Sequence, residues 1–398
     1  MTDERISCPG LDGSNPLTML AALGLFGLGT RRGLVERMGW EWSGCWTPFY
    51  EAAGTGTREG LVAEVLAELA GAEVEAARRA LDTLLAEKAA LDASLRDLEE
   101  QARHHPKGAA LRAAKRQIAD MKARSRDLKS VVAREGARID ALARESIERK
   151  HPVTRLALHL DDETKGGLSR GDFVKLAADP AAAPYLAGLA CDGVLPIRAK
   201  SVIARTHLSF ANNNSGKMLI KDFAALARLA STAGVEDALF GDGGIREAIT
   251  GLGWDPETQR SYALQFSDPG KAEASCQVVR NALAFMGLEF FTVVPTGSDR
   301  ATVGFHEIPV ASAGELRGED DGEPEQSPGG RAAEFLTWPI WESMLGIDEV
   351  KSLIVRSELA ATVPDARACR GMGIAAVLRS RRVSFDKRSY FAQARPVA

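Results

Sequence analysis

Apolar residues recur at alternating intervals of three and four between Leu61 and Lys150. In the first part of this segment they are Ala77, Leu81, Leu84, Leu91, Leu95 and Leu98. In the second part they are Leu111, Ala114, Ile118, Met121, Leu128, Val132, Ile139 and Leu142. This spacing puts apolar side chains in one stripe along a helix and is typical of a coiled coil. Pro106 and Gly108 stand between the two parts and are unsuited to one continuous helix. The pattern therefore predicts an antiparallel helical hairpin with arms of roughly 40 residues, each about 60 Å long.

Residues 1–58 carry a different pattern. A short strand is expected at Glu4–Cys8, and Asn15 before Pro16 is a favourable helix start, with an N-cap side chain followed by proline at the first helical position. The segment that follows is apolar on almost every face, so we expect a buried helix that ends at Gly27 and Gly29. Aromatic residues then alternate on both sides of Ser43-Gly44, which predicts a β-hairpin. A strand, a helix and a hairpin form a small α+β unit, and a ferredoxin-like or RRM-like start is one possibility.

Residues 151–398 return to short helices and strands. Strands are expected at 203–210, 260–266, 290–294, 301–306 and 373–383, and helices at 218–230, 274–286 and 347–356. The acidic, glycine-rich segment 313–331 is expected to be a mobile loop. The predicted fold class is therefore α+β, with mixed sheets and short helices interrupted by a long antiparallel helical-hairpin (coiled-coil) insertion at 59–150. Residues 1–58 and 151–398 are expected to pack together.

The two arms of the predicted hairpin differ in charge. Residues 61–100 contain 10 acidic and 4 basic residues, a net charge of −6, whereas residues 101–150 contain 14 basic and 6 acidic residues, a net charge of +8. Opposite charges favour pairing of the arms, although each exposed pair contributes only about 0.3–0.5 kcal/mol. The surplus positive charge is also suited to a phosphate backbone. It lies at Arg112, Lys115, Arg116, Lys122, Arg124, Arg126 and Lys129, of which Arg116, Lys122 and Arg126 are taken as candidate nucleic-acid contacts.

The whole chain of 398 residues has a net charge of −4, so contact with a polyanion requires a local patch. No signal peptide pattern and no apolar run of about 18 residues is found, which predicts a cytoplasmic protein without a membrane segment. The five cysteines are far apart and form no CxxC pair, which favours reduced, buried thiols.

A polar loop in the second half is a candidate anion site. The expected strand at 203–210 leads into Ala211-Asn212-Asn213-Asn214-Ser215-Gly216-Lys217, and a helix follows. Ala211 and Met218 stand where a P-loop needs glycine and a hydroxyl residue, so an NTPase is excluded. Phosphate contacts by Asn213, Asn214, Ser215 and Lys217 at the helix start remain open beside a simple capped helix.

A second candidate is the basic C-terminal cluster, in which Phe385, Tyr390 and Phe391 are interleaved with cations. Its basic members are Arg379, Arg381, Arg382, Lys387 and Arg388. Basic and aromatic residues together suit phosphate contact and base stacking. An edge strand whose charges face solvent and prevent aggregation is the alternative.

The familiar catalytic patterns are missing from the sequence. The six histidines form no HExxH or HxH motif, and no GxSxG or GxGxxG motif is found in a suitable context. His207 and His306 lie in alternating apolar segments and are expected to be packed residues. The acidic turn at 161–164 lacks the spacing of a calcium loop. We therefore assign no catalytic residue, metal or cofactor, and expect no enzyme activity.

Several framework stretches together resemble a known family. They are Leu11-Asp12-Gly13-Ser14-Asn15-Pro16-Leu17, residues 262–269, residues 282–295, Thr302-Val303-Gly304-Phe305, Thr337-Trp338-Pro339-Ile340-Trp341 and residues 379–383. In this order they resemble subunits of type I CRISPR effector complexes of the type I-G (formerly I-U) loci, in the large-subunit or accessory class. The long hairpin and the acidic net charge depart from that family.

The resemblance implies a non-catalytic subunit of a guide-RNA surveillance complex in antiviral defence. Its expected partners are crRNA, target DNA and other CRISPR effector subunits, and a separate nuclease-helicase would cut. Two alternatives stay open: a coiled-coil scaffold that binds proteins without nucleic acid, and a phage-defence enzyme with a dispersed active site.

Overall fold

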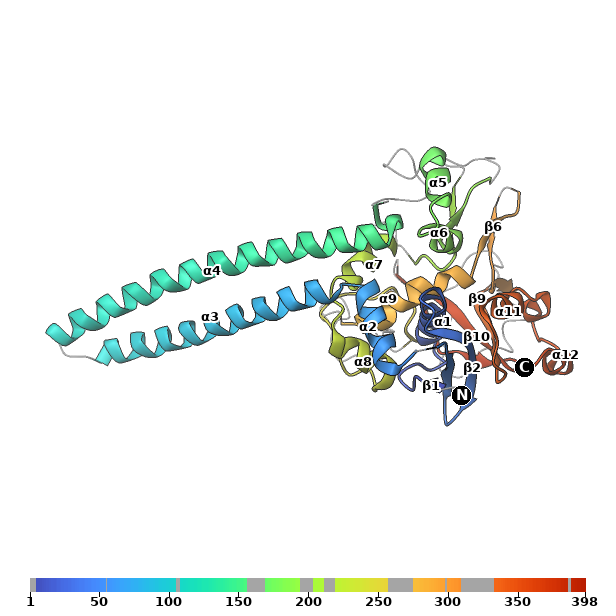
Figure 1. Ribbon diagram of the computed structural model, residues 1–398, viewed down its shortest axis with the longest axis horizontal. Helices are drawn as coiled ribbons and strands as arrows, with labels where there is room; N and C mark the ends of the chain where they lie inside the picture. The colour runs from blue at the N-terminus through green and yellow to red at the C-terminus, as the bar shows by residue number, and fades with distance from the viewer. Residues whose placement is uncertain are drawn as a thin grey trace. The chain divides into compact units, whose positions relative to one another are not determined.

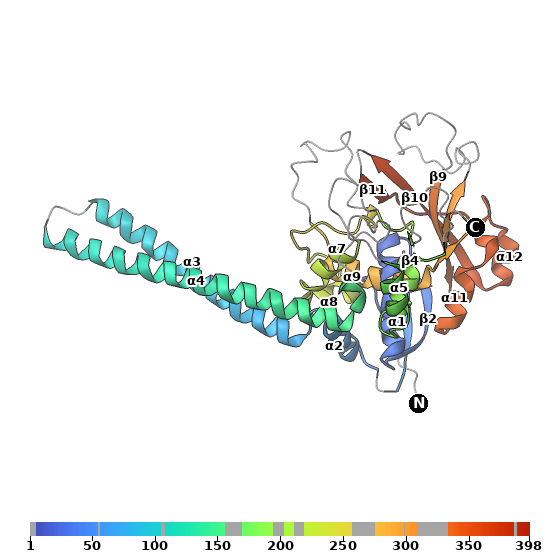
Figure 2. The ribbon, with the colours of Figure 1, turned by 90° about the horizontal axis from the view of Figure 1, so that it is seen from above.

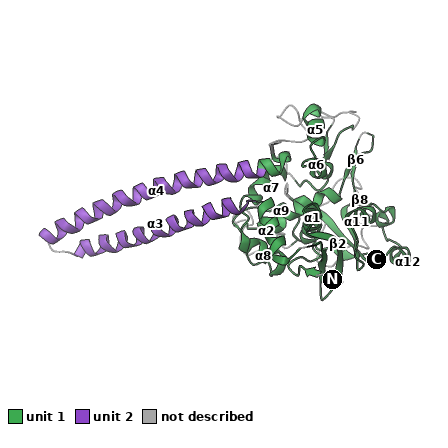
Figure 3. Ribbon diagram, viewed as in Figure 1, with its two compact units in different colours: residues 1–69, 148–398 green, residues 70–147 purple. Residues whose placement is uncertain are grey.

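The structure, a computed structural model, describes residues 5–54, 56–104, 108–155, 169–193, 203–210, 219–256, 275–297, 299–308, 333–385 and 388–398 (Figure 1). The chain forms two units: residues 1–69 with 148–398, and residues 70–147 (Figure 3). The fold is mixed α+β, with helices and several small sheets. Unit 1 therefore includes residues 59–69, which the sequence pattern placed in the insertion. Among the described residues, no helix is long and apolar enough to cross a membrane.

Unit 1 begins with a split β–α–β arrangement. Strands β1 (Arg5–Ser7) and β2 (Val35–Trp42) both pair antiparallel with β3 (Trp46–Ala52), which lies between them. Helix α1 (Pro16–Arg31) connects β1 to β2. A ferredoxin-like unit starts with this strand order. The predicted helix start is confirmed, because the Asn15 side chain accepts a hydrogen bond of 2.9 Å from the Leu17 amide and Pro16 occupies the first turn.

Helix α1 is the centre of the core of unit 1. All its residues from Pro16 to Gly29 are buried, and Tyr50 Oη donates to the Ala22 carbonyl at 3.0 Å. The predicted end at Gly27 and Gly29 is wrong, since the helix continues to Arg31. These glycines serve packing instead. A Cβ on Gly27 would lie 1.7 Å from Glu289 Oε1, and one on Gly29 would lie 2.9 Å from a methyl group of Val35.

The partner of α1 is α9 (Val278–Met286), which is also buried throughout and continues into the 3-10 turn η5 (Gly287–Phe290). The two helices approach so closely that a Cβ on Gly24 would lie 1.9 Å from the Leu283 carbonyl oxygen. A Cβ on Gly287 would lie 2.0 Å from the Leu20 carbonyl oxygen. Residues without a side chain are therefore required on both sides of this crossing.

The larger sheet lies in the C-terminal part. Its order is β11 (Arg388–Phe391), β10 (Ile374–Phe385), β9 (Ala333–Trp341) and β8 (Phe305–Ile308), with β12 (Arg395–Pro396) also paired to β10. All these pairings are antiparallel. The Trp338 indole donates to the Gly13 carbonyl at 2.9 Å and the Trp341 indole to the Met38 carbonyl at 3.1 Å. The two sheets are thus joined through buried tryptophans.

Shorter elements complete unit 1 (Figures 1 and 2). They are α2 (Arg58–Glu68), η1 (Pro152–Arg155), α5 (Arg170–Ala177), α6 (Ala183–Leu189), α7 (Leu219–Ala227), α8 (Thr232–Phe240), α11 (Ile347–Ile354), η7 (Ser357–Ala360) and α12 (Ala366–Gly371). Two small sheets pair β4 (Ala190–Cys191) with β5 (Ala204–Arg205), and β6 (Val293–Pro295) with β7 (Arg300–Thr302).

Several predicted strands needed correction. The strand expected at 203–210 is only the two residues of β5, because its partner β4 is equally short. The strand expected at 301–306 is divided into β7 and β8 by Gly304, whose φ of 75° requires the left-handed region. Residues 260–266 and the acidic segment 313–331 lie outside the described residues.

Unit 2 consists of most of two long helices, α3 (Ala72–His104) and α4 (Ala109–Lys150). Glu99 pairs with Lys122 at 2.7 Å, whereas Asp92 accepts from Ser125 at 2.6 Å, so residue numbers run in opposite directions and the helices are antiparallel (Figures 1 and 2). The first arm starts later than the pattern predicted. Gly71, with a φ of 86°, separates α3 from α2, which is an independent helix.

Two polar residues, Lys88 and Ser125, occupy positions of the apolar stripe, and the structure explains them. Lys88 Nζ lies 2.5 Å from Asp92 Oδ2, and Ser125 Oγ lies 2.6 Å from the other carboxylate oxygen. The hydrogen bonds from Lys88 and Ser125 lower the pKa of Asp92. These groups satisfy each other across the two helices, and polar contacts of this kind favour one alignment of the two helices.

Both ends of the inserted segment meet within unit 1. Lys150 Nζ donates to the carbonyls of Ala67 and Leu69, and His151 Nε2 lies 3.2 Å from the Glu68 carbonyl. Glu68 Oε2 also accepts from Arg32 at 2.6 Å. His151 is fully buried against the rings of Tyr185 and Phe223. We call Arg32, Glu68, Lys150 and His151 the junction cluster.

The substitution Gly24→Ala tests the helix crossing. We expect it to lower the free energy of unfolding by about 3 kcal/mol, because the added methyl meets a backbone carbonyl that cannot rotate away. Gly171→Ala is the control, since its nearest neighbour would be Ser169 Oγ at 3.8 Å. Chemical denaturation of both variants measures the difference. Equal stabilities would contradict the described packing.

His151 predicts a pH dependence of stability. Burial is the largest cause that lowers its pKa from the ordinary 6.5, and Lys150 and Arg31 act in the same direction, while Glu68 opposes them. The unfolded chain therefore binds a proton more readily, and stability falls as the pH drops below about 6.5, by up to about 1 kcal/mol per pH unit. His151→Phe keeps a ring at this position, and unfolding curves between pH 7 and 5 should show a shallower slope. His104 is exposed, so the control substitution His104→Gln should leave the dependence of the free energy of unfolding on pH as in the wild type.

Candidate nucleic-acid interface

Helix α4 carries one continuous basic surface. In its seven-residue repeat, three neighbouring rows of positions hold only basic residues and alanine between residues 112 and 129: 112/119/126, 115/122/129 and 116/123. Its basic members, which we call the α4 stripe, are Arg112, Lys115, Arg116, Lys122, Arg126 and Lys129, and all six are exposed. Lys115, Lys122 and Lys129 are seven residues apart and share one helix position. Because of this seven-residue spacing, the cations lie in a line along one side of the helix.

The α4 stripe is only partly neutralised by α3. Lys122 Nζ pairs with Glu99 at 2.7 Å, and the neighbouring Arg124 pairs with Glu87 at 3.0 Å. Within the described part of the chain, Arg112, Lys115, Arg116, Arg126 and Lys129 form no ion pair within 4.0 Å. The acidic arm therefore compensates only part of the charge of its basic partner.

The local charge balance supports this conclusion. Residues 112–129 contain seven basic residues and two acidic ones, Asp120 and Asp127, a net charge of +5. Both acids lie on one row at the side of the α4 stripe. Ala119 and Ala123 fill the positions between the cations, so no bulky side chain keeps a ligand away from them. The surface can attract a polyanion through charge alone.

The sequence prediction for Arg379 needs a correction. This residue is only 3% exposed, and its guanidinium donates to Thr337 Oγ1 and to the carbonyls of Leu359, Ala361 and Thr362 at 2.7–3.2 Å. Burial lowers its pKa to about 10. The guanidinium connects β9 and β10 to η7 and to the two residues after it, so it is a structural group and offers no surface for phosphate.

The other C-terminal cations are only partly available. Arg382 pairs with Glu334 at 3.1 Å and its guanidinium lies 4.9 Å from the centre of the Phe210 ring, so most of its donors face protein. Arg381 is half-buried, and among the described residues its Nε has no hydrogen-bond partner. Lys387 and the side chain of Arg388 lie outside the described residues. The described members of the predicted C-terminal cluster, Arg379, Arg381 and Arg382, do not form one exposed surface.

Two arginines that the sequence reasoning missed lie near Arg382. Arg300 Nε donates to the Arg205 carbonyl at 2.8 Å, and Arg300 Nη1 pairs with Asp299 at 3.0 Å. Both guanidinium groups contribute to the lowered pKa of Arg382, for which burial is the largest cause. No sequence signal links residues 205, 300 and 382. With Asp299 and Glu334 beside them, these cations are largely balanced.

Of the two predicted core histidines, His207 lies beside this group and His306 lies near Arg379. His207 stacks on Phe305 with ring centres 5.0 Å apart, and its Nδ1 lies 2.9 Å from Thr302 Oγ1. His306 lies on β8, and its buried Nε2 has no hydrogen-bond partner in the part of the chain that the structure describes. Burial is the main cause that lowers the pKa of each to about 4, so both are neutral at pH 7. Both are half-buried packed side chains.

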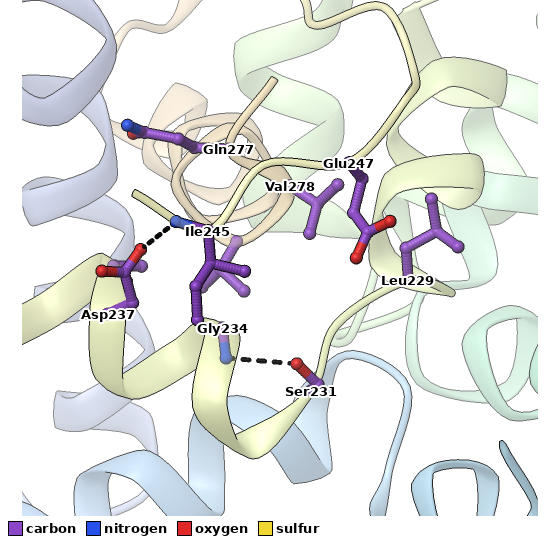
Figure 4. A pocket seen from close by; sticks show the side chains of 10 residues that line it. Leu229, Ser231, Gly234, Asp237, Ile245, Glu247, Gln277 and Val278 are labelled. Atoms are coloured by element: carbon purple, nitrogen blue, oxygen red, sulfur yellow. Dashed lines mark hydrogen bonds between the residues drawn. The ribbon is translucent and has the colours of Figure 1, made fainter. Parts of the chain in front are cut away.

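The remaining predicted contacts, Asn213, Asn214, Ser215 and Lys217, lie outside the described residues, as does the acidic turn at 161–164. A small pocket lies nearby in sequence, between α8 and the start of α9 (Figure 4). Its Asp237 carboxylate accepts from the Ile245 amide at 2.9 Å, and Ser231 Oγ accepts from the Gly234 amide at 3.1 Å. These polar groups hold the loop and cap α8. Among the described residues, no group of three or more His, Cys, Asp or Glu side chains is placed to hold a metal ion.

Comparison with known proteins adds no assignment, because no protein-family model and no curated protein matches the chain. The α4 stripe is therefore selected by its exposure, its charge and its regular spacing.

The contrast between Arg379 and the α4 stripe can be measured. Arg379→Gln should lower the free energy of unfolding by about 2–4 kcal/mol, because it removes a charged donor and leaves buried acceptors unpaired. Arg367→Gln, an exposed arginine on α12, should change it by less than about 0.5 kcal/mol. Thermal and urea unfolding compare the two variants. A stable Arg379→Gln protein would return this residue to the list of candidate ligand contacts.

Proposed function

We propose that this chain is a non-enzymatic subunit of a type I CRISPR guide-RNA surveillance complex. It contacts phosphates of crRNA or target DNA and braces neighbouring subunits in cytoplasmic antiviral defence. The observation that carries the nucleic-acid part is the α4 stripe, six exposed cations along one side of a helix with five of them unpaired among the described residues. The CRISPR part is supported by the framework stretches of the sequence, from Leu11-Asp12-Gly13-Ser14-Asn15-Pro16-Leu17 onward.

The charge distribution explains how an acidic protein binds a polyanion. The net charge of −4 is spread over 398 residues, whereas the +5 is concentrated in 18 residues. At physiological salt, charges farther apart than about 8 Å are largely screened, so the local surface decides the interaction. Each phosphate neutralised by Lys or Arg releases counterions, which drives binding and makes it dependent on salt.

A coiled-coil scaffold is the second candidate function, and one observation favours it. Val74 is the only buried residue on the described part of α3, and Leu85 is 43% exposed. Two helices alone do not cover the apolar side chains of α3, and a helix from a partner protein would extend the seam. Replacing residues 71–146 by a short glycine linker separates the two functions. If the shortened protein loses nucleic-acid binding but keeps its protein partners, the hairpin serves nucleic-acid binding, and the protein contacts lie elsewhere in the chain.

The α4 stripe gives a direct prediction. The triple variant Lys115→Gln, Arg116→Gln and Arg126→Gln should bind nucleic acid at least tenfold more weakly near 0.1 M salt, because three phosphate contacts are lost. The dependence of log Kd on log salt should become shallower by about 2–3 for the same reason. Fluorescence anisotropy with labelled nucleic acid at several salt concentrations measures both quantities.

The control removes three cations from the other helix. Arg79, Arg96 and Arg103 are exposed on α3, and changing them to Gln alters the net charge of the protein equally. This variant should keep the wild-type affinity and salt dependence. Equal losses in the two triple variants would mean that total charge, and not the α4 stripe, determines binding.

A further inference from the structure

The chemistry of unit 2 restricts what the α4 stripe can recognise. Residues 70–147 contain no Phe, Trp or Tyr. Proteins that hold single strands without sequence preference stack bases on aromatic side chains, each worth about 1–3 kcal/mol. The α4 stripe has no such platform. Its contacts with nucleic acid are therefore limited to the charged backbone.

The side chains of the α4 stripe also offer little for reading bases. Between the cations stand Ala119 and Ala123, and the stripe contains no Asn or Gln, the side chains that pair with adenine. Lysine, which provides three of the six cations, contacts phosphate as a point charge. We therefore expect binding without sequence preference.

The shape of the α4 stripe favours a stiff ligand. From Arg112 to Lys129 the helix rises about 25 Å, and Lys115, Lys122 and Lys129 repeat about every 10 Å on a straight line. A duplex carries one charge per about 1.7 Å of its axis and is straight over this distance, since its persistence length is about 500 Å. About seven base pairs span the stripe. A single strand would have to be straightened at a cost in conformational entropy and carries its charge less densely.

The width of the hairpin decides how a duplex lies on it. One α-helix of about 10–12 Å just fills the major groove, which is about 12 Å wide. The contacts of Lys122 with Glu99 and of Arg124 with Glu87 hold α3 against α4, so the pair is too wide to enter the groove. The α4 stripe can therefore only lie across the outer surface of a duplex, where phosphates are exposed.

We propose that the α4 stripe binds the phosphate backbone of a nucleic-acid duplex, without reading its sequence. This inference rests on the proposed nucleic-acid function and narrows it to a ligand class. The line of cations meets phosphates across the duplex surface, and the acidic α3 faces away from the ligand because it would repel it. DNA and RNA duplexes share this chemistry.

The test compares ligands with the full-length protein. Labelled DNA duplex, RNA duplex and single strands, each of about 20 nucleotides per strand, are titrated by anisotropy at matched salt. The DNA or RNA duplex should bind at least tenfold more tightly than either single strand, and a scrambled duplex sequence should change Kd by less than about twofold. The ratio of the Kd values for the DNA duplex and the RNA duplex shows which of the two the α4 stripe prefers.

The variants distinguish the possible failures. In the Lys115/Arg116/Arg126 triple glutamine variant the duplex preference should disappear, while the Arg79/Arg96/Arg103 control should keep it. Single strands that bind as tightly as duplexes, with affinity lost in the triple variant, would overturn the duplex assignment and leave the proposed nucleic-acid contact intact. Affinity for all ligands that is unchanged in the triple variant would overturn both. Circular dichroism of each variant verifies that the helices are retained.

Discussion

The junction cluster is the constraint on which the two-unit arrangement depends. An inserted segment can be tolerated in a domain when its ends lie close together, because the cost of closing a longer loop rises only slowly with length. Here α2 ends at Glu68 and α4 at Lys150, and Lys150 and His151 contact the backbone of residues 67–69. Arg32 and Glu68 connect this point to the end of α1. Unit 1 therefore keeps one continuous core although 78 residues of unit 2 interrupt its sequence.

An ion pair with a buried carboxylate lies close to this junction. Arg31 Nη1 pairs with Glu289 Oε2 at 2.6 Å and its other terminal nitrogen donates to Tyr185 Oη at 2.9 Å. The Glu289 side chain is 1% exposed and occupies the space that Gly27 leaves beside it. A carboxylate at this depth is tolerated only when it is paired. The network links α1, α6 and η5, and it explains why arginines follow an apolar helix.

Arginine in this protein has two different roles, and burial separates them. Arg379 and Arg382 each satisfy acceptors inside unit 1, where desolvation makes an unpaired charge costly. The cations of the α4 stripe remain in water and keep their charge available to a ligand. Two helices of a hairpin have a large surface and little interior, so a basic helix of this kind has nowhere to bury its charge. This difference makes unit 2 the better candidate for a polyanion interface.

The sequence by itself determined those helices and strands that depend on the spacing and type of neighbouring residues. The three–four spacing gave the two long helices, Asn15 and Pro16 gave the start of α1, and alternation with Ser43-Gly44 gave the β2–β3 hairpin. It also named the cations of the α4 stripe, because an exposed helix shows its repeat directly. Only the tertiary structure decided which arginines are buried, since the acceptors of Arg379 come from Thr337 and from residues 359–362. The tertiary structure also decided where α1 ends. Gly27 and Gly29 make room for Glu289 and Val35, and they do not form a turn. Contacts between residues far apart in the chain carry no periodic signal, and these contacts set the burial on which each charge depends.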